Sequence, residues 1–109
     1  MEPETDILAR VRGAANIRIL FLPHALHQML RPDRMIRRSE VRCVVVRGML
    51  IENYPEDSRG HSCLLLGRGS ENRPIHVVCS PKKDYLAVIT AYLPDEQKWS
   101  ADFSRRIEP

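Results

Sequence analysis

The hydrophobic residues of this chain follow a helical spacing in its first half and an alternating spacing in its second half. Apolar positions three or four residues apart form one face of a helix. They predict three helices, over residues 4–15, from Pro23 to an interruption or end at Pro32, and over residues 40–47. Ser39 can cap the third helix through its hydroxyl group, and Gly48 can end it. Val41, Val44 and Val45 would then face the core.

From Met49 onward, short runs rich in Val, Ile, Leu and Tyr are separated by polar loops, a pattern typical of strands. Four strands are predicted, over residues 49–54, 62–66, 75–80 and 85–92. Residues 17–22 can form a short strand or an extended lead-in, and residues 96–106 a short helix or edge cover anchored by Trp99 and Phe103. The sequence therefore predicts an α+β fold, in which two or three N-terminal helices pack on a four-stranded antiparallel meander sheet.

The last predicted hairpin carries polar side chains within its apolar runs. Its four-residue break is too short for a parallel crossover, so the two strands are expected to be antiparallel. If Pro81 pairs with Tyr85 across the turn, His76 lies opposite Thr90. That register would gather His76, Thr90 and Tyr92 into one polar cluster, and a slip of one residue would scatter it.

Length and composition fit one globular domain over residues 1–109, with frayed ends at residues 1–5 and 105–109. The longest apolar run, residues 85–93, falls short of the roughly 20 residues that a membrane helix needs. The acidic start lacks the features of a signal peptide. We therefore expect a cytoplasmic protein that does not associate with a membrane.

The cysteines agree with that expectation. There are three of them, an odd number, and none is part of a CxxC pair, as expected of reduced thiols in a cytoplasm. Cys63 and Cys79 fall within predicted strands, and Cys43 falls within the third predicted helix. We expect all three to be buried thiols, none of them a nucleophile.

Positive charge is concentrated in one part of the chain. Nine arginines lie between Arg10 and Arg47, against two acidic residues, although the whole chain carries only +3. Arginine forms bidentate contacts with phosphate, so this region is expected to bind a polyanion, most simply RNA. The alternative is a solvated helical surface with no ligand. The candidate phosphate-binding residues are Arg34, Arg37, Arg38, Arg68 and Arg73.

Several kinds of active site are absent from the sequence. There is no Walker A loop, no GxGxxG and no GxSxG motif. His24 and His27 are three residues apart, on one face of the predicted helix, but a metal site needs at least a third ligand from elsewhere. We expect neither a metal nor a cofactor, and a core or capping role for His27.

The remaining polar residues suit metal-free cleavage of RNA, which needs a base, an acid and a cation at the phosphate. His24 and His76 could supply the base and the acid, and Tyr92 could replace one of them as an acid. Arg68, Arg73 or the basic helix could supply the cation. The alternatives are a half-buried strand histidine satisfied by one hydrogen bond, for His76, and a packed aromatic side chain, for Tyr92.

Several motifs in the chain resemble a known bacterial family. They are P-H-A-L-H-Q-M-L at 23–30, S-E-V before a helix ending at Gly48, I-E-N-Y-P-E-D at 51–57, R-P-I-H-V-V at 73–78, and I-T-A-Y-L-P-D at 89–95, followed by Trp99. Together they resemble domain of unknown function 4258 (DUF4258) over nearly the whole chain. Residues 31–38 depart from the family pattern, which affects any role for Arg34 or Arg37.

The resemblance implies a fold similar to RelE-type toxins, within the barnase, colicin and RelE group of metal-independent ribonucleases. It also implies a place in a toxin–antitoxin pair, with an antitoxin partner that masks the active face. By position, it points to His24, His76, Thr90 and Tyr92 as site residues. We therefore expect an RNA-cleaving, toxin-like domain. The alternative is a module of the same fold that binds nucleic acid or a protein without catalysis.

Overall fold

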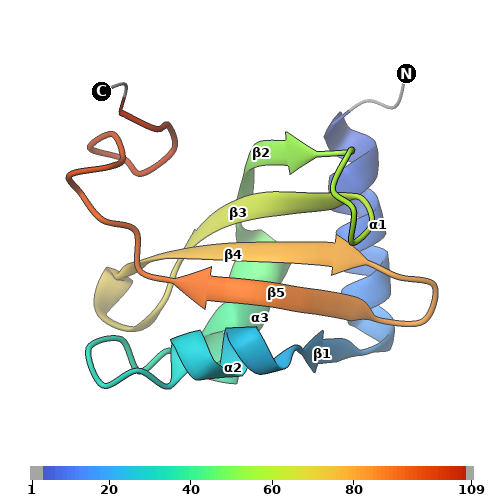
Figure 1. Ribbon diagram of the computed structural model, residues 1–109, viewed down its shortest axis with the longest axis horizontal. Helices are drawn as coiled ribbons and strands as arrows, with labels where there is room; N and C mark the ends of the chain where they lie inside the picture. The colour runs from blue at the N-terminus through green and yellow to red at the C-terminus, as the bar shows by residue number, and fades with distance from the viewer. Residues whose placement is uncertain (1–3, 108–109) are drawn as a thin grey trace.

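The computed structural model describes the backbone of residues 4–107 and the side chains of residues 7–107. Its helices are α1 (Glu4–Ile17), α2 (Pro23–Met29) and α3 (Arg38–Arg47). Its strands are β1 (Ile19–Phe21), β2 (Met49–Tyr54), β3 (Ser62–Arg68), β4 (Pro74–Pro81) and β5 (Leu86–Tyr92), with a short 3-10 helix at Ser70–Asn72. In Figure 1, α1 and α3 lie behind the sheet and α2 lies along its lower edge.

The five strands form one mixed sheet in the order β1-β5-β4-β3-β2. Strands β2 to β5 make the predicted antiparallel meander, and β1 pairs parallel with β5, from Ile19 opposite Leu86 to Phe21 opposite Val88. The α+β class is therefore confirmed, but the prediction of a four-stranded antiparallel sheet is wrong. The fifth strand arises because residues 17–22, left open as a strand or a lead-in, hydrogen-bond to the free edge of β5.

The core lies between the sheet and the two longer helices. Alternate residues of the inner strands, among them Leu65 and Val77, are buried against Val41, Val44 and Val45 of α3, as predicted. Gly67 allows α3 to approach this closely, because a Cβ atom there would lie 2.8 Å from Cγ2 of Val44. Among the described helices, none is long and apolar enough to cross a membrane.

The start of α3 differs from the prediction. The helix begins at Arg38, so Ser39 lies inside it and does not cap it. The Glu40 carboxylate instead accepts a hydrogen bond from the backbone N–H of Arg37 at 2.9 Å. Cys43 is exposed, contrary to the prediction of a buried thiol, whereas Cys63 and Cys79 are buried as expected.

The register of the β4–β5 hairpin also differs from the prediction. The turn is longer by one position, with Pro81 opposite Leu86, and a β-bulge at Ile89 shifts the pairing again. His76 therefore lies opposite Tyr92 and not opposite Thr90. The two shifts together keep His76 and Tyr92 on one face of the sheet, the face that turns away from α1 and α3.

Residues 94–107, which we call the C-terminal cover, pack on this outer face. They form turns, not the short helix considered as one alternative, and a bridge joins Trp99 to Arg106. The backbone N–H of Ile107 donates to the carbonyl of Lys98 at 2.9 Å. Frayed ends at residues 1–5 and 105–109 stay a prediction, and residues 1–3 and 108–109 lie outside the described part.

Candidate functional site

His76 is the centre of a polar cluster on the outer face of the sheet, beneath the C-terminal cover. Its ring is fully buried, and its Nε2 lies 2.9 Å from the carbonyl oxygen of Phe103. Because a carbonyl only accepts, Nε2 must carry the proton and donate. In the neutral ring, Nδ1 is then an acceptor, and the hydroxyl of Tyr92 donates to it over 3.3 Å. The edge-on ring of Trp99, 4.4 Å away between centroids, completes the enclosure.

This environment keeps the imidazole neutral. Burial lowers the pKa of His76 and outweighs the carbonyl of Phe103 and the charge of Glu52, both of which raise it. Burial likewise raises the pKa of the Tyr92 phenol, so that this hydroxyl keeps its proton near neutral pH. The pair is thus a neutral base next to a protonated acid, both held away from water.

A charged group borders the pair. The guanidinium of Arg106 binds the Glu52 carboxylate with two hydrogen bonds, of 2.9 and 3.1 Å, and lies 4.8 Å from the centroid of the Trp99 ring. The Tyr54 hydroxyl donates to the same carboxylate. Burial opposes ionisation of Glu52, but the hydrogen bonds from Arg106 and Tyr54 lower its pKa overall. Burial and the hydrogen bond to Glu52 raise the pKa of Tyr54 to about 12.

Sequence reasoning missed Glu52, Tyr54 and Arg106 as members of this cluster. For the first two a signal was present, since Glu52 and Tyr54 alternate along a predicted strand and would share its polar face. Arg106 gave no such signal, because it reaches Glu52 from an irregular segment whose path depends on tertiary packing.

The predicted histidine pair does not meet in this structure. His24 is exposed on α2, and within residues 7–107 no hydrogen bond joins it to His76. Thr90 lies opposite Val78, half-buried on the outer face and two residues from Tyr92. The structure therefore brings His76 and Tyr92 together and leaves His24 apart. His27 is also exposed, and the described residues contain no group of three potential ligands that could hold a metal ion.

Of the predicted phosphate-binding arginines, two are partly buried, Arg34 and Arg73, and three are exposed, Arg37, Arg38 and Arg68. Arg73 is held inside the fold: its guanidinium pairs with Glu40 at 3.1 Å and donates to two backbone carbonyls. Arg34 donates to the side chain of Gln28 at 2.6 Å. Arg37 and Arg38, both exposed, flank the start of α3. Arg68 is exposed at the end of β3, two residues before Ser70, whose backbone N–H donates to Glu40 of α3 at 2.7 Å.

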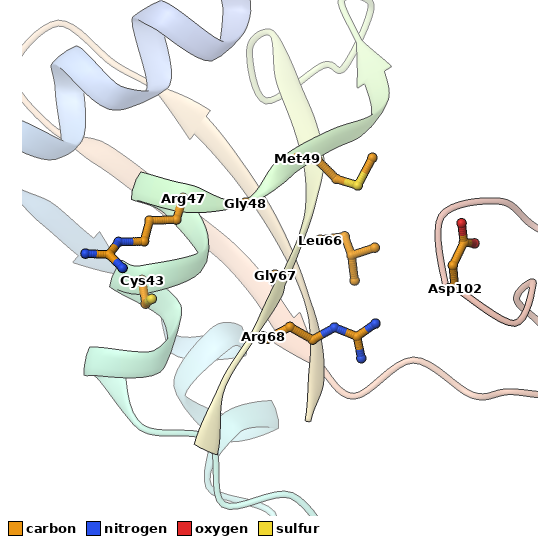
Figure 2. A pocket seen from close by; sticks show the side chains of 8 residues that line it. All are labelled: Cys43, Arg47, Gly48, Met49, Leu66, Gly67, Arg68 and Asp102. Atoms are coloured by element: carbon orange, nitrogen blue, oxygen red, sulfur yellow. The ribbon is translucent and has the colours of Figure 1, made fainter. Parts of the chain in front are cut away.

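A hollow of about 480 Å³ opens beside Arg68, where β2 and β3 meet the C-terminal cover. Figure 2 shows Arg68, Met49 and Leu66 projecting toward Asp102 of the cover, with the side chains of Cys43 and Arg47 on the other side of β3. The guanidinium of Arg68 also lies 5.9 Å from the centroid of the Phe103 ring. Phe103 therefore contacts both Arg68, at the hollow, and the buried His76.

Comparison with known protein families gives one match, to the model described as Domain of unknown function (DUF4258), over residues 21–93. The chain belongs to this family. Comparisons with curated proteins and with solved structures gave no match.

The DUF4258 match covers only part of the polar cluster around His76. It includes both members of the buried pair, His76 and Tyr92, together with Glu52. It ends at Leu93, just before the C-terminal cover begins. The residues that enclose His76, namely Trp99 and Phe103, therefore lie outside the part of the chain that the family model describes.

Proposed function

We propose that this DUF4258 domain binds RNA at the hollow beside Arg68, and that His76 and Tyr92 form a metal-independent ribonuclease site kept closed by the C-terminal cover. The observation that carries the proposal is the position of Phe103. Its ring lies beneath the guanidinium of Arg68, and its carbonyl accepts from His76. An RNA strand that displaces this one residue would both occupy the hollow and free the imidazole.

The charges around the hollow support binding of a phosphate chain. Arg47 and Arg68 are exposed, and neither has a carboxylate within ion-pair distance among the side chains that the structure describes. A guanidinium without a carboxylate partner can contact phosphate in a bidentate manner. Met49 and Leu66, which project on the same side of β3 as Arg68 (Figure 2), provide an apolar surface against which a base can pack.

The chemistry proposed for the opened site needs no metal. Once the carbonyl of Phe103 is displaced, the neutral ring of His76 can carry its proton on Nδ1 and donate it to the Tyr92 oxygen. Nε2 would then accept the proton of a ribose 2′-hydroxyl, whose oxygen bonds to phosphorus. The bond from phosphorus to the 5′-oxygen would break, and Tyr92 would give its proton to that leaving oxygen. Arg68, at the hollow, would stabilise the extra negative charge on the phosphate. His24 was expected to share this chemistry, but Tyr92 is the residue hydrogen-bonded to His76, which favours Tyr92 as the acid.

The family resemblance of the sequence motifs suggests a wider biological role. We propose a RelE-type, toxin-like ribonuclease acting in the cytoplasm, with an antitoxin as its protein partner. The α+β class and the cluster on one sheet face support this extension. The competing function is RNA binding without cleavage, and the full burial of His76, with both ring nitrogens hydrogen-bonded, favours it.

Binding is tested by reversing charge at the hollow. The double substitution Arg47→Glu and Arg68→Glu should weaken binding of a single-stranded RNA by about 10-fold or more and reduce the salt slope of log Kd by about 2. The matched control is Arg18→Glu with Lys83→Glu, which changes the net charge equally at the opposite end of the sheet. Fluorescence anisotropy over a salt series measures both. Equal losses in the two double variants would mean that the affinity comes from net charge and not from the hollow.

Cleavage is tested by loosening the cover. Arg106→Gln removes the two hydrogen bonds to Glu52 from a side chain that is 62% exposed, so the fold should survive. Trp99 is the single tryptophan of the chain, and its quenching by acrylamide should increase by about twofold as the cover opens. In the presence of a chelator, this variant should cleave RNA faster than the wild type does.

The control for this experiment is His76→Gln in the Arg106→Gln background. A glutamine amide can still donate to the carbonyl of Phe103, but it cannot exchange a proton. Cleavage should therefore disappear while RNA binding remains. RNA that stays intact with a demonstrably opened cover would exclude the ribonuclease and leave the binding function.

A further inference from the structure

An apolar groove lies on the α2 side of the molecule, away from the hollow and the buried His76. It has a volume of about 340 Å³, and its apolar lining comes from α2 and the loop that follows it: Leu26, Met29, Leu30, Met35 and Ile36. Leu30 is 65% exposed and Met35 is 59% exposed. Two large apolar side chains side by side in water are a feature of interaction surfaces, because isolated domains usually cover such positions.

The loop that presents this groove is held in a fixed and unfavourable conformation. Met35 has a φ angle of 49°, which is rare for a residue with a side chain. Arg73 holds it there, donating to the carbonyl of Arg34 at 2.5 Å and to that of Met35 at 3.3 Å. On the other side of Met35, the N–H of Ile36 donates to the carbonyl of Met29 at 2.9 Å. The fold thus keeps an unfavourable backbone conformation at Met35 while 59% of this residue stays exposed.

The rim of the groove is positively charged. Arg37 and Arg38 line it directly, and both are exposed. Among the side chains of residues 7–107, no carboxylate lies within ion-pair distance of either one. The acidic residue nearest in sequence, Glu40, is buried and pairs with Arg73. An occupant must therefore offer an apolar face flanked by negative charge.

We propose that this groove is the docking site for an acidic amphipathic helix of a partner protein. Apolar side chains at positions i, i+3 or i+4, and i+7 of that helix would fill the groove between Leu30 and Met35, and its glutamates or aspartates would pair with Arg37 and Arg38. A second copy of this chain fits less well, because it would bring the same arginines against each other. RNA has the negative charge but no continuous apolar face. The inference does not depend on the proposed function, since it uses neither Arg68 nor His76.

The test uses two synthetic peptides of about 16 residues with the same leucine face, one with glutamate and one with lysine on the polar face. Fluorescence anisotropy with the full chain should show binding of the acidic peptide, and binding of the basic peptide at least about 10-fold weaker. Leu30→Ser with Met35→Ser should weaken binding of the acidic peptide by about 10-fold. Arg37→Glu with Arg38→Glu should do the same and should restore binding of the basic peptide.

The matched control is Ile17→Ser with Val46→Ser, which removes two other exposed apolar side chains, 65% and 48% exposed. This variant should bind the acidic peptide within about twofold of the wild type. Failure of the acidic peptide to bind at about 100 μM would overturn the proposal, as would equal binding of both peptides or equal losses in control and groove variants. Self-association that disappears in Leu30→Ser with Met35→Ser would also overturn it, in favour of a second copy.

Discussion

Replacing Glu40 with alanine is expected to lower the free energy of unfolding by about 3 kcal/mol. The Glu40 side chain is 7% exposed and joins the start of α3 to the loop at residues 70–73. Its carboxylate accepts from the N–H of Arg37 at 2.9 Å, from the N–H of Ser70 at 2.7 Å and from the guanidinium of Arg73 at 3.1 Å. Alanine would leave the Arg73 charge without its counterion, and Arg73, at 26% exposed, recovers only part of that loss from water. Urea unfolding followed by Trp99 fluorescence measures the change.

The same contacts should make the contribution of Glu40 depend on pH. Burial alone would raise its pKa, but the hydrogen bonds from Arg37, Ser70 and Arg73 lower it to about 2 from the ordinary 4.5. A carboxyl group with a depressed pKa in the folded state stabilises the protein fully above about pH 4.5, and this stabilisation is lost as the pH falls toward 2. Glu40→Gln keeps the shape of the side chain without the charge. It should therefore lose less stability than the wild type over that range, and parallel curves would contradict the role given to the carboxylate.

Glu40 also connects stability to the proposed docking groove. It holds Arg73, and Arg73 in turn holds the carbonyls of Arg34 and Met35. The strained backbone at Met35 is thus supported by a buried ion pair, not by local sequence preference. Arg73, one of the arginines predicted to bind phosphate, is thus engaged in the folded chain by Glu40 and by these two carbonyls.

The spacing of hydrophobic residues along the chain was enough to predict most helices and strands. Helical spacing located α1, α2 and α3, and alternation located β2 to β5. The parallel pairing of β1 with β5 could not be predicted in this way, because Ile19–Phe21 is only three residues long and its partner lies near the other end of the chain. The bulge at Ile89 has no local signal either, and it changed the residue opposite His76.

The exposure of Cys43 could have been predicted, because the spacing of the valines in the sequence shows which face of α3 is buried. Val41, Val44 and Val45 define the buried stripe of α3, and Cys43 lies off that stripe by the geometry of a helix. The general tendency of cysteine to be buried led to the wrong prediction, where the periodicity of the helix would have led to the correct one.

The candidate site was predictable only in part. Polar residues within apolar strands indicated His76 and Tyr92, and these two are in contact. The same signal cannot distinguish a catalytic histidine from one that is buried and hydrogen-bonded, because both look alike in a strand. The ring is enclosed by the C-terminal cover, whose Trp99 and Phe103 reach it from an irregular segment that gives no such signal.

The buried position of His76 implies that stability should depend on pH in a second, separate range. Burial lowers its pKa below the ordinary 6.5, so the unfolded chain binds the proton more tightly than the folded chain does. Its contribution is complete above about pH 6.5 and is lost as the pH falls below that value. This loss begins at a higher pH than the loss due to Glu40, so the onsets of the two can be compared in one pH series.

Replacing His76 with alanine is expected to lower the free energy of unfolding by about 2–4 kcal/mol near neutral pH. The change would open a cavity against Trp99 and leave the carbonyl of Phe103 and the hydroxyl of Tyr92 without their partner. His24→Ala is the matched control, because that ring is exposed, and its effect should stay within about 0.5 kcal/mol. The variant at His76 should also lose the decline in stability that begins near pH 6.5. A stability equal to that of the His24 variant would show that the ring is not enclosed, and that water already reaches the imidazole.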